Sequence, residues 1–341
     1  MKQLYAREII NQPDAGSAPV TEAIAPPVCR RRIFSGAFWP MAGVFTALLG
    51  ASLLSAVGAP TQPQYQFIEI PVPYPSYAVG INDDGIMTGY YIDPDTGDVL
   101  SYVLNRGVLT KGISAPGATY TSIGDANNLG VECGNFGDYT NQRPVFYDIR
   151  HGTFDPLPEI PGMPLNFCDG INDFGHASGV AYAGGNWQDG GTGLGLNWIW
   201  DGRHYSYFTV PGAVNGASAG GINDWDQVTG YYVDNSGLPQ GFLKDGPNFT
   251  TFDAPNSLYT IGSGINNLGT VDGLYVNPDN SHHGFIWSKG NFATVDANVP
   301  GTIGTEWIGL NDQGDLAGIY FDTNELPHAV IALRVDGDCH K

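Results

Sequence analysis

The sequence predicts an all-β fold, a six-bladed β-propeller with four antiparallel strands in each blade, over residues 60–336. Composition gives the first indication, because 48 of the 341 residues are glycine and only 14% are charged, which suits short strands joined by tight turns. A turn motif then recurs six times at intervals close to 45 residues. Finally, the segments between these turns supply four strands per repeat, which is typical of a propeller blade.

The recurring turn starts with asparagine and, in five of six copies, ends with glycine at the fourth position. A type I turn followed by a residue with positive φ closes a hairpin in register with twisted strands, which explains both residues. Asp226 is the one replacement for that glycine. The intervals of 45, 45, 51, 43 and 45 residues separate Asn82, Asn127, Asn172, Asn223, Asn266 and Asn311.

A second glycine follows seven residues after each asparagine. Glycine inside a strand marks a bulge or a close approach of another backbone, so we expect such an approach here. The six glycines are Gly89, Gly134, Gly179, Gly230, Gly273 and Gly318.

The remaining strands are predicted from apolar and aromatic segments. The third strands are expected at residues 100–104, 145–149, 196–200, 241–244, 284–288 and 328–333. Fourth strands are expected at residues 109–114, 154–160, 205–210, 249–254 and 292–297, one fewer than the third strands. The missing copy appears at residues 65–71, so we expect this N-terminal strand to pair with residues 328–334 and to close the last blade, which removes the open sheet edges. An open β-solenoid is the competing architecture.

These hairpins resemble those of the bacterial extracellular HAF-repeat family, in which a His-Ala-Phe segment follows a Gly-Ile-Asn-x-x-Gly hairpin. The hairpin residues are present as Gly80-Ile81-Asn82 and Gly221-Ile222-Asn223. The His-Ala-Phe positions hold His283-Gly284-Phe285, Gln240-Gly241-Phe242 and His328-Ala329-Val330, so each differs in at least one place. The resemblance covers about residues 65–335 and implies secretion and a propeller, but it carries over no catalytic motif.

Residues 1–59 differ from the rest of the chain and predict an export signal or a membrane anchor. Arg30, Arg31 and Arg32 precede an apolar stretch over residues 37–59, and Arg31-Arg32-Ile33-Phe34 resembles a twin-arginine export pattern. The protein is therefore expected to be exported, periplasmic or extracellular. The alternative is an inner-membrane anchor, since about 20 apolar residues can span a bilayer, and membrane contact is then confined to residues 37–59. Residues 337–341 form a tail.

The net charge limits the class of binding partner, and the cysteine positions limit which disulfides can form. The formal net charge of −20 excludes nonspecific nucleic-acid binding, which requires clustered Lys and Arg. Cys133 and Cys168 fall in adjacent repeats and can form a disulfide in an oxidising compartment, with two buried thiols as the equal alternative.

The candidate ligand residues come from loops on one predicted face. Blade topology places the connections between second and third strands on the same face as the connections between blades. This face carries an insertion over residues 184–196, with Trp187 as a sugar-stacking candidate and Asp189 beside it. Asp138 and Asp234 lie in equivalent loops. No residue is assigned a catalytic role.

Asp93 and Asp95 are the candidate metal ligands, because Asp93-Pro94-Asp95-Thr96-Gly97-Asp98 loosely resembles a calcium loop. It lacks the downstream glutamate of the full motif, and the same residues are ordinary in turns. Calcium is the one cofactor that the sequence leaves open.

Two functions remain. One is a secreted or periplasmic binding module for an unknown glycan or protein, which the absence of an acid, base and nucleophile cluster favours. The alternative is an extracellular polysaccharide hydrolase or lyase that uses Asp138, Asp189 and Asp234 near the central channel.

Overall fold

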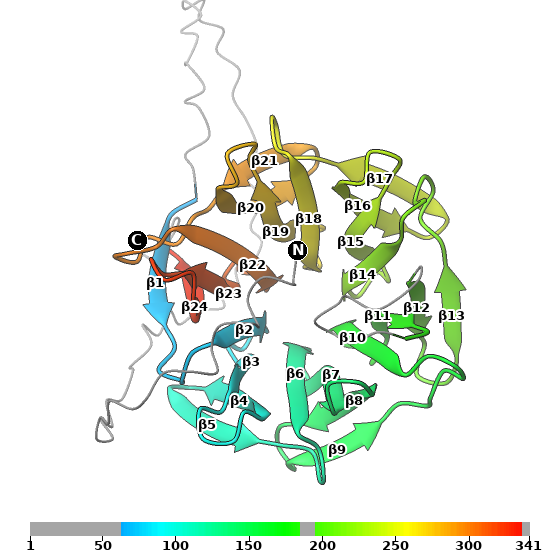
Figure 1. Ribbon diagram of the computed structural model, residues 1–341, viewed down its shortest axis with the longest axis vertical. Helices are drawn as coiled ribbons and strands as arrows, with labels where there is room; N and C mark the ends of the chain where they lie inside the picture. The colour runs from blue at the N-terminus through cyan, green and yellow to red at the C-terminus, as the bar shows by residue number, and fades with distance from the viewer. Residues whose placement is uncertain (1–62, 185–194, 336–341) are drawn as a thin grey trace, which may run out of the picture.

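The computed structural model describes residues 63–184 and 195–335, which contain 24 strands and no helix. Sheets of these strands stand radially around a central axis (Figure 1). This is the all-β, propeller-like arrangement that the sequence predicts. The export segment, Trp187 and Asp189 of the insertion, and the C-terminal tail lie outside the described residues. Within the described residues, no helix is long and apolar enough to cross a membrane.

The sheets are built from groups of four antiparallel strands. Three sheets have four strands each, and a fourth sheet has twelve. The large sheet consists of three such groups joined by two parallel contacts of one residue pair each, Val99 with Tyr120 and Gln142 with Leu165. We call the resulting six groups in the described residues units 1 to 6.

The strand bounds follow the chain order. Units 1 and 2 comprise β2 (Ser76–Ile81), β3 (Met87–Ile92), β4 (Val99–Asn105), β5 (Val108–Ile113), β6 (Tyr120–Ala126), β7 (Val131–Gly137), β8 (Gln142–Asp148) and β9 (Thr153–Pro156). Units 3 and 4 comprise β10 (Leu165–Ile171), β11 (Ala177–Tyr182), β12 (Leu196–Trp200), β13 (Tyr205–Phe208), β14 (Ala217–Ile222), β15 (Val228–Val233), β16 (Pro239–Asp245) and β17 (Asn248–Phe252). Units 5 and 6 comprise β18 (Tyr259–Ile265), β19 (Val271–Val276), β20 (His282–Ser288), β21 (Asn291–Thr294), β22 (Gly304–Leu310), β23 (Leu316–Phe321), β24 (Pro327–Arg334) and β1 (Tyr65–Glu69).

Unit 6 combines the two ends of the described chain. Strand β1 pairs antiparallel with β24, from Tyr65 opposite Arg334 to Glu69 opposite Val330, and the Ile70 N–H donates to the Ala329 carbonyl at 3.0 Å. The two strands lie side by side in Figure 1. The predicted pairing of residues 65–71 with 328–334 is therefore confirmed.

The fourth strands end earlier than the sequence predicts. The strand expected over residues 154–160 ends at Pro156, and the strand expected over 249–254 ends at Phe252. Proline cannot donate to a strand ladder, and a proline follows each of these ends, at Pro158 and Pro255. The third strands, in contrast, match the expected ranges to within three residues at each end.

The second glycine of each repeat lies where a neighbouring backbone and a large side chain meet. A Cβ on Gly230 would be 2.1 Å from the Ser218 carbonyl oxygen and 2.9 Å from the buried Phe242 ring. Trp198 fills the equivalent place beside Gly179 in unit 3. The close approach predicted from these glycines is confirmed, and it sets the spacing between the innermost strands and the core.

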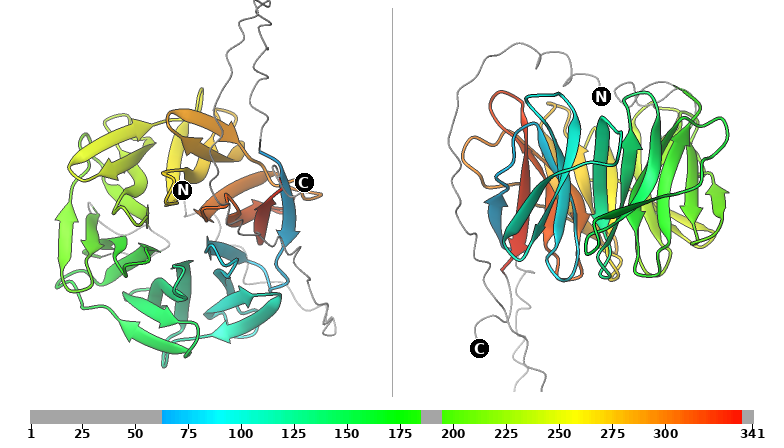
Figure 2. Two further views of the ribbon diagram at one scale, coloured as in Figure 1. Left: turned by 180° about the vertical axis from the view of Figure 1, so that it is seen from behind. Right: turned by 90° about the horizontal axis from the view of Figure 1, so that it is seen from below.

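Strand connections gather on two opposite faces, as the side view in Figure 2 shows. We call the hairpin face the one that carries the turns between first and second strands, together with the connections between third and fourth strands. The loop face carries the connections between second and third strands and those between units.

Candidate functional site

A ring of asparagines surrounds the axis on the hairpin face. The Oδ1 atom of Asn82 accepts hydrogen bonds from the N–H groups of Asp84 at 3.1 Å and Ile86 at 2.9 Å, which fixes its own turn. Its Nδ2 donates to the backbone carbonyl of Asn127 in the next unit. Six such bonds, of 2.9–3.1 Å, run from unit to unit and return from Asn311 to Asn82.

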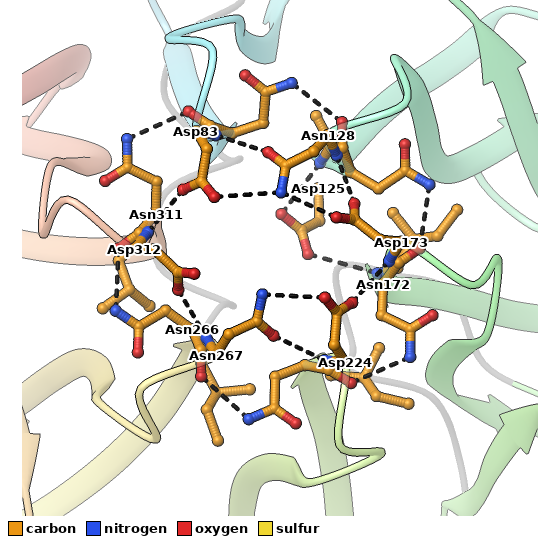
Figure 3. A pocket seen from close by; sticks show the side chains of 18 of the residues that line it. Asp83, Asp125, Asn128, Asn172, Asp173, Asp224, Asn266, Asn267, Asn311 and Asp312 are labelled. Atoms are coloured by element: carbon orange, nitrogen blue, oxygen red, sulfur yellow. Dashed lines mark hydrogen bonds between the residues drawn. The ribbon is translucent and has the colours of Figure 1, made fainter. Parts of the chain in front are cut away.

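The residues that follow these asparagines form a second ring. Each backbone N–H donates to the side-chain Oδ1 of the equivalent residue in the next unit, at 2.7–2.9 Å. Asn128 Nδ2 also donates to the carboxylates of Asp83 at 3.2 Å and Asp173 at 3.0 Å (Figure 3). The members of this ring are Asp83, Asn128, Asp173, Asp224, Asn267 and Asp312.

These two rings enclose a small axial pocket of about 50 Å³, into which Asp125 also projects (Figure 3). Asp125 occupies a position where the other five units have glycine, at residues 80, 170, 221, 264 and 309. Burial raises its pKa to about 7, although the N–H groups of Ile171 and Ala126 stabilise its charge. The pocket is therefore lined by carboxylates from five residues and favours a cationic group.

Two further acids are fully buried in the strands behind the pocket. Glu132 stands where the other units have Met87, Ala177, Val228, Val271 and Leu316, and neither of its carboxyl oxygens has a hydrogen-bond partner. Asp272 accepts the Gly264 N–H at 2.6 Å, and burial raises its pKa to about 8. Sequence reasoning missed both residues and Asp125, although aligning every column of the repeat would have found them.

On the loop face, a groove of about 290 Å³ lies where the β15–β16 connection of unit 4 meets the segment leading to unit 5. Leu238 and Leu258 supply its apolar surface, and Gln240, Asp253 and Asn256 supply polar groups. Partial burial and the charge of Asp234 raise the pKa of Asp253 to about 6. The groove thus offers both acceptors and donors beside an apolar surface.

Asp234 orders one wall of this groove. Its Oδ1 accepts bonds from the Ser236 N–H and hydroxyl at 2.7 and 2.6 Å, and its Oδ2 accepts Gln240 Nε2 at 2.9 Å. These bonds lower the pKa of Asp234. Gln240 Oε1 in turn accepts the Tyr232 hydroxyl at 2.6 Å. The side chain that faces the groove is therefore held in a single orientation.

Unit 5 has histidine at the position of Gln240, with different hydrogen-bond partners. His283 stacks on Tyr275, and its Nδ1 lies 2.9 Å from Asp296 Oδ2 while its Nε2 lies 3.0 Å from Ser281 Oγ. This geometry resembles a nucleophile triad, but the Ser281 hydroxyl also lies 2.7 Å from Asp279 Oδ1, to which it donates. A proton committed to a carboxylate leaves the serine poorly placed as a nucleophile.

Unit 6 carries the third copy. His328 stacks on Tyr320 and lies between Glu69 Oε1 at 3.5 Å and Asp322 Oδ2 at 3.3 Å. His283 and His328 therefore connect strands through carboxylates, and no metal is needed to explain them.

The residues predicted as sites from the sequence are not brought together. Asp138 is exposed in unit 2, where its Oδ1 accepts bonds from Thr140 and Asn141 of its own turn and its pKa is lowered. Asp234 lies beside the groove of unit 4. Trp187 and Asp189 lie outside the described residues.

The predicted metal ligands are part of an ordinary turn. Asp93 Oδ1 accepts the Asp95 N–H at 3.1 Å, and the Asp93 carbonyl accepts the Gly97 N–H at 2.8 Å. Across residues 63–184 and 195–335, no group of three or more His, Cys, Asp or Glu side chains is placed to hold a metal ion. Calcium at Asp93 and Asp95 stays a prediction.

Cys133 and Cys168 are neighbouring buried thiols in units 2 and 3. Burial raises the pKa of both, and their side chains share a hydrogen bond. The disulfide between them stays a prediction.

No protein-family model and no curated protein matches the chain. Among solved structures, it is similar to AofleA from Arthrobotrys oligospora, with 12% identity and a TM-score of 0.50 over 81% of this chain and 91% of that one. It is also similar to XC5397 of Xanthomonas campestris, a gluconolactonase, with 10% identity and a TM-score of 0.49 over 80% and 90% of the two chains. The β-propeller domain of the Trilobed protease from Pyrococcus furiosus gives 8% identity and a TM-score of 0.44 over 78% and 95%. Such low identities bear on the fold alone.

Proposed function

We propose that this protein is an exported, six-bladed β-propeller of HAF-repeat type that binds a glycan without converting it. Units 1 to 6 are its blades. The asparagine ring and the pairing of β1 with β24 support closure of the propeller, because both connect the last unit back to the first part of the chain. The basic and apolar residues 30–59 support export.

The groove beside Asp234 is the single observation that carries the binding proposal. It combines an apolar surface from Leu238 and Leu258 with the polar side chains of Gln240, Asp253 and Asn256. Apolar surface suits the C–H faces of a sugar ring, while carboxylates and amides hydrogen-bond its hydroxyl groups. Because Asp234 fixes Gln240 before a ligand arrives, little side-chain entropy is lost on binding.

A glycan array followed by calorimetry tests this proposal. We expect saturable binding of at least one neutral or cationic glycan, and Gln240→Ala to weaken it about tenfold, since one oriented hydrogen bond is worth roughly 1.4 kcal/mol. Asp138→Asn changes an equivalent loop of unit 2 and serves as the matched control. Glycan binding that Gln240→Ala leaves unchanged, or no binding on the array, would contradict the proposal.

One observation favours a second candidate, a polysaccharide hydrolase at the same groove. The pKa of Asp253 is raised to about 6 while that of its neighbour Asp234 is lowered. Two carboxyl groups with pKa values moved apart are the pattern of a general acid beside a general base or nucleophile. Asp253 would then protonate the leaving group.

Reducing-end assays separate the two candidates. Hydrolysis predicts product from a bound polysaccharide, a fall in rate above about pH 6, and loss of turnover with retained binding in Asp253→Asn. Binding without product at any pH supports the noncatalytic module.

A further inference from the structure

Four consecutive units present large apolar side chains at the tips of the turns on the hairpin face. Each is the third residue of its Asn-turn, which points away from the hydrogen-bonded rings. Units 1 and 6 carry Asp84 and Gln313 at this position. The apolar tips and their exposures are Leu129 at 66%, Phe174 at 71%, Trp225 at 70% and Leu268 at 64%.

Acidic groups lie inside this apolar arc, and charges of both signs lie outside it. Inside it lies the axial pocket, with the carboxylates of the second ring and Asp125. Outside it, the connections between third and fourth strands carry the exposed basic residues Arg106, Arg150, Arg203 and Lys289, with the acids Asp148, Asp201 and Asp245 beside them. In unit 2, the Ile149 N–H donates to the Gly130 carbonyl, which places the basic connection directly beside the turn. These four are half of the eight Lys and Arg residues in the described chain.

Hydrogen bonds and ring contacts hold the two aromatic residues of the arc in place. Trp225 Nε1 donates to the carbonyl of Asn267 at 3.1 Å, so the indole lies across the junction of units 4 and 5. Phe174 packs against His176, whose Nδ1 lies 2.8 Å from Asp226 Oδ1 in the next unit. A preordered aromatic surface loses little entropy on binding, and aromatic residues dominate the affinity of protein interfaces.

We infer that the hairpin face docks a protein partner whose exposed segment places a lysine ammonium in the axial pocket, with apolar residues on either side. An ammonium group is close in size to a water molecule, so it fits a pocket of about 50 Å³. A sugar ring is too large for this pocket. The carboxylates around the axis supply the charge complementarity. A second copy of this chain does not fit this face symmetrically, because the two carboxylate rings would then meet.

The test selects, on the whole immobilised protein, bead-displayed six-residue peptides with a central lysine and variable flanks. A second library has norleucine in place of lysine. We expect peptides with apolar flanks to be enriched from the lysine library and not from the norleucine library. The selected peptides should bind at least tenfold more weakly to Trp225→Ala and to the double variant Asp224→Asn/Asp312→Asn. Asparagine already occupies this ring position in units 2 and 5, so these changes keep the shape of the ring.

Variants of the loop face are the matched controls. Leu258→Ala removes an exposed apolar side chain there, and Gln240→Ala impairs the proposed glycan groove; both should bind the selected peptides normally. Equal enrichment from the norleucine library, no enrichment, or binding that Trp225→Ala leaves intact would overturn the inference. Binding to phosphatidylcholine vesicles that Trp225→Ala abolishes, without lysine-dependent peptide binding, would overturn it in favour of a lipid surface. Glycan binding measured on the same variants reports the proposed function separately.

Discussion

The two faces use the repeat differently. On the hairpin face, the first two residues of every turn form the same hydrogen bonds to the next unit in all six units, while the turn tips vary. On the loop face, the connections differ in length and in bonding: unit 2 has a short turn at Asp138, unit 4 has a groove, and units 5 and 6 have histidine clusters. The face with fixed bonding connects the units, while the other is free to diverge.

This difference separates structural from functional variation. A residue that bonds to the next unit cannot change alone, because its partner would lose a hydrogen bond in a buried place. Apart from bonds such as that of Trp225 to Asn267, the turn tips and the loop face lack this constraint. Differences between units at those positions therefore indicate binding surfaces more strongly than the repeated Asn-Asp turns do.

Gly230→Val should be the most damaging change, because it disrupts the spacing on which both faces depend. A Cβ would lie 2.1 Å from the Ser218 carbonyl oxygen, and neither backbone can move without displacing Phe242. We expect more than about 4 kcal/mol of destabilisation, seen as insoluble or unfolded protein by circular dichroism. Gly237→Ala is the control: its φ is +80° but the space around it is open, so about 1 kcal/mol is expected. Similar losses for both variants would contradict the close-packing argument.

Asn266→Ala tests the hairpin face alone. The change removes bonds to Leu268 N and Thr270 N within the turn and the bond to the Asn311 carbonyl in the next unit. We expect a loss of about 3 kcal/mol in the free energy of unfolding, measured by urea denaturation. Asn256→Gly on the loop face, which accommodates the positive φ of 64°, should change the free energy of unfolding by less than about 0.5 kcal/mol. A small effect of Asn266→Ala would mean that water molecules replace the hydrogen bonds of the missing side chain.

The sequence predicted the elements that repeat and missed those that occur once. The turn asparagines, the positive φ of Gly85 and Asp226, and the β1 pairing all follow from local chemistry and from strand counting. The bonds between units could not be predicted, because Asn82 Nδ2 meets a carbonyl 45 residues away whose position depends on the whole ring. The loop-face prediction gave Asp234 but not Asp253, whose raised pKa arises from surroundings that only folding assembles.

Glu132→Met should stabilise the protein. The variant places in unit 2 the residue that unit 1 already has at Met87, and it removes two carboxyl oxygens that are buried without partners. We expect a gain of at least about 2 kcal/mol at pH 7, measured by urea denaturation. A loss of stability would mean that Glu132 has a bonding partner, such as buried water.

The same variant should flatten the pH dependence of stability. Burial raises the pKa of Glu132 above its ordinary value of 4.5, so folding favours the protonated acid. The stability that the protonated Glu132 contributes is then fully present below about pH 4.5 and is lost as pH rises, by up to about 1.4 kcal/mol per pH unit. Asp125 and Asp272, whose pKa values are raised from 3.8 to about 7 and about 8, add losses of the same sign over those pH ranges. Urea denaturation from pH 4 to pH 9 should therefore show a shallower decline for Glu132→Met and for Asp272→Thr than for the native chain.

The smallest expected effect concerns the turn of unit 4, where the hairpin face departs from its own repeat. Asp226→Gly relieves a positive φ of 56°, which favours the variant, but removes the bonds to His176 Nδ1 at 2.8 Å and Asn172 Nδ2 at 3.1 Å. Because these contributions oppose one another, the net change should stay within about 0.5 kcal/mol. A double-mutant cycle with His176→Ala isolates the contact between units 3 and 4 and should give a coupling energy of about 0.5 kcal/mol. No coupling would mean that Asp226 serves instead to order Phe174 and Trp225, and weaker peptide binding by Asp226→Gly alone would then show this.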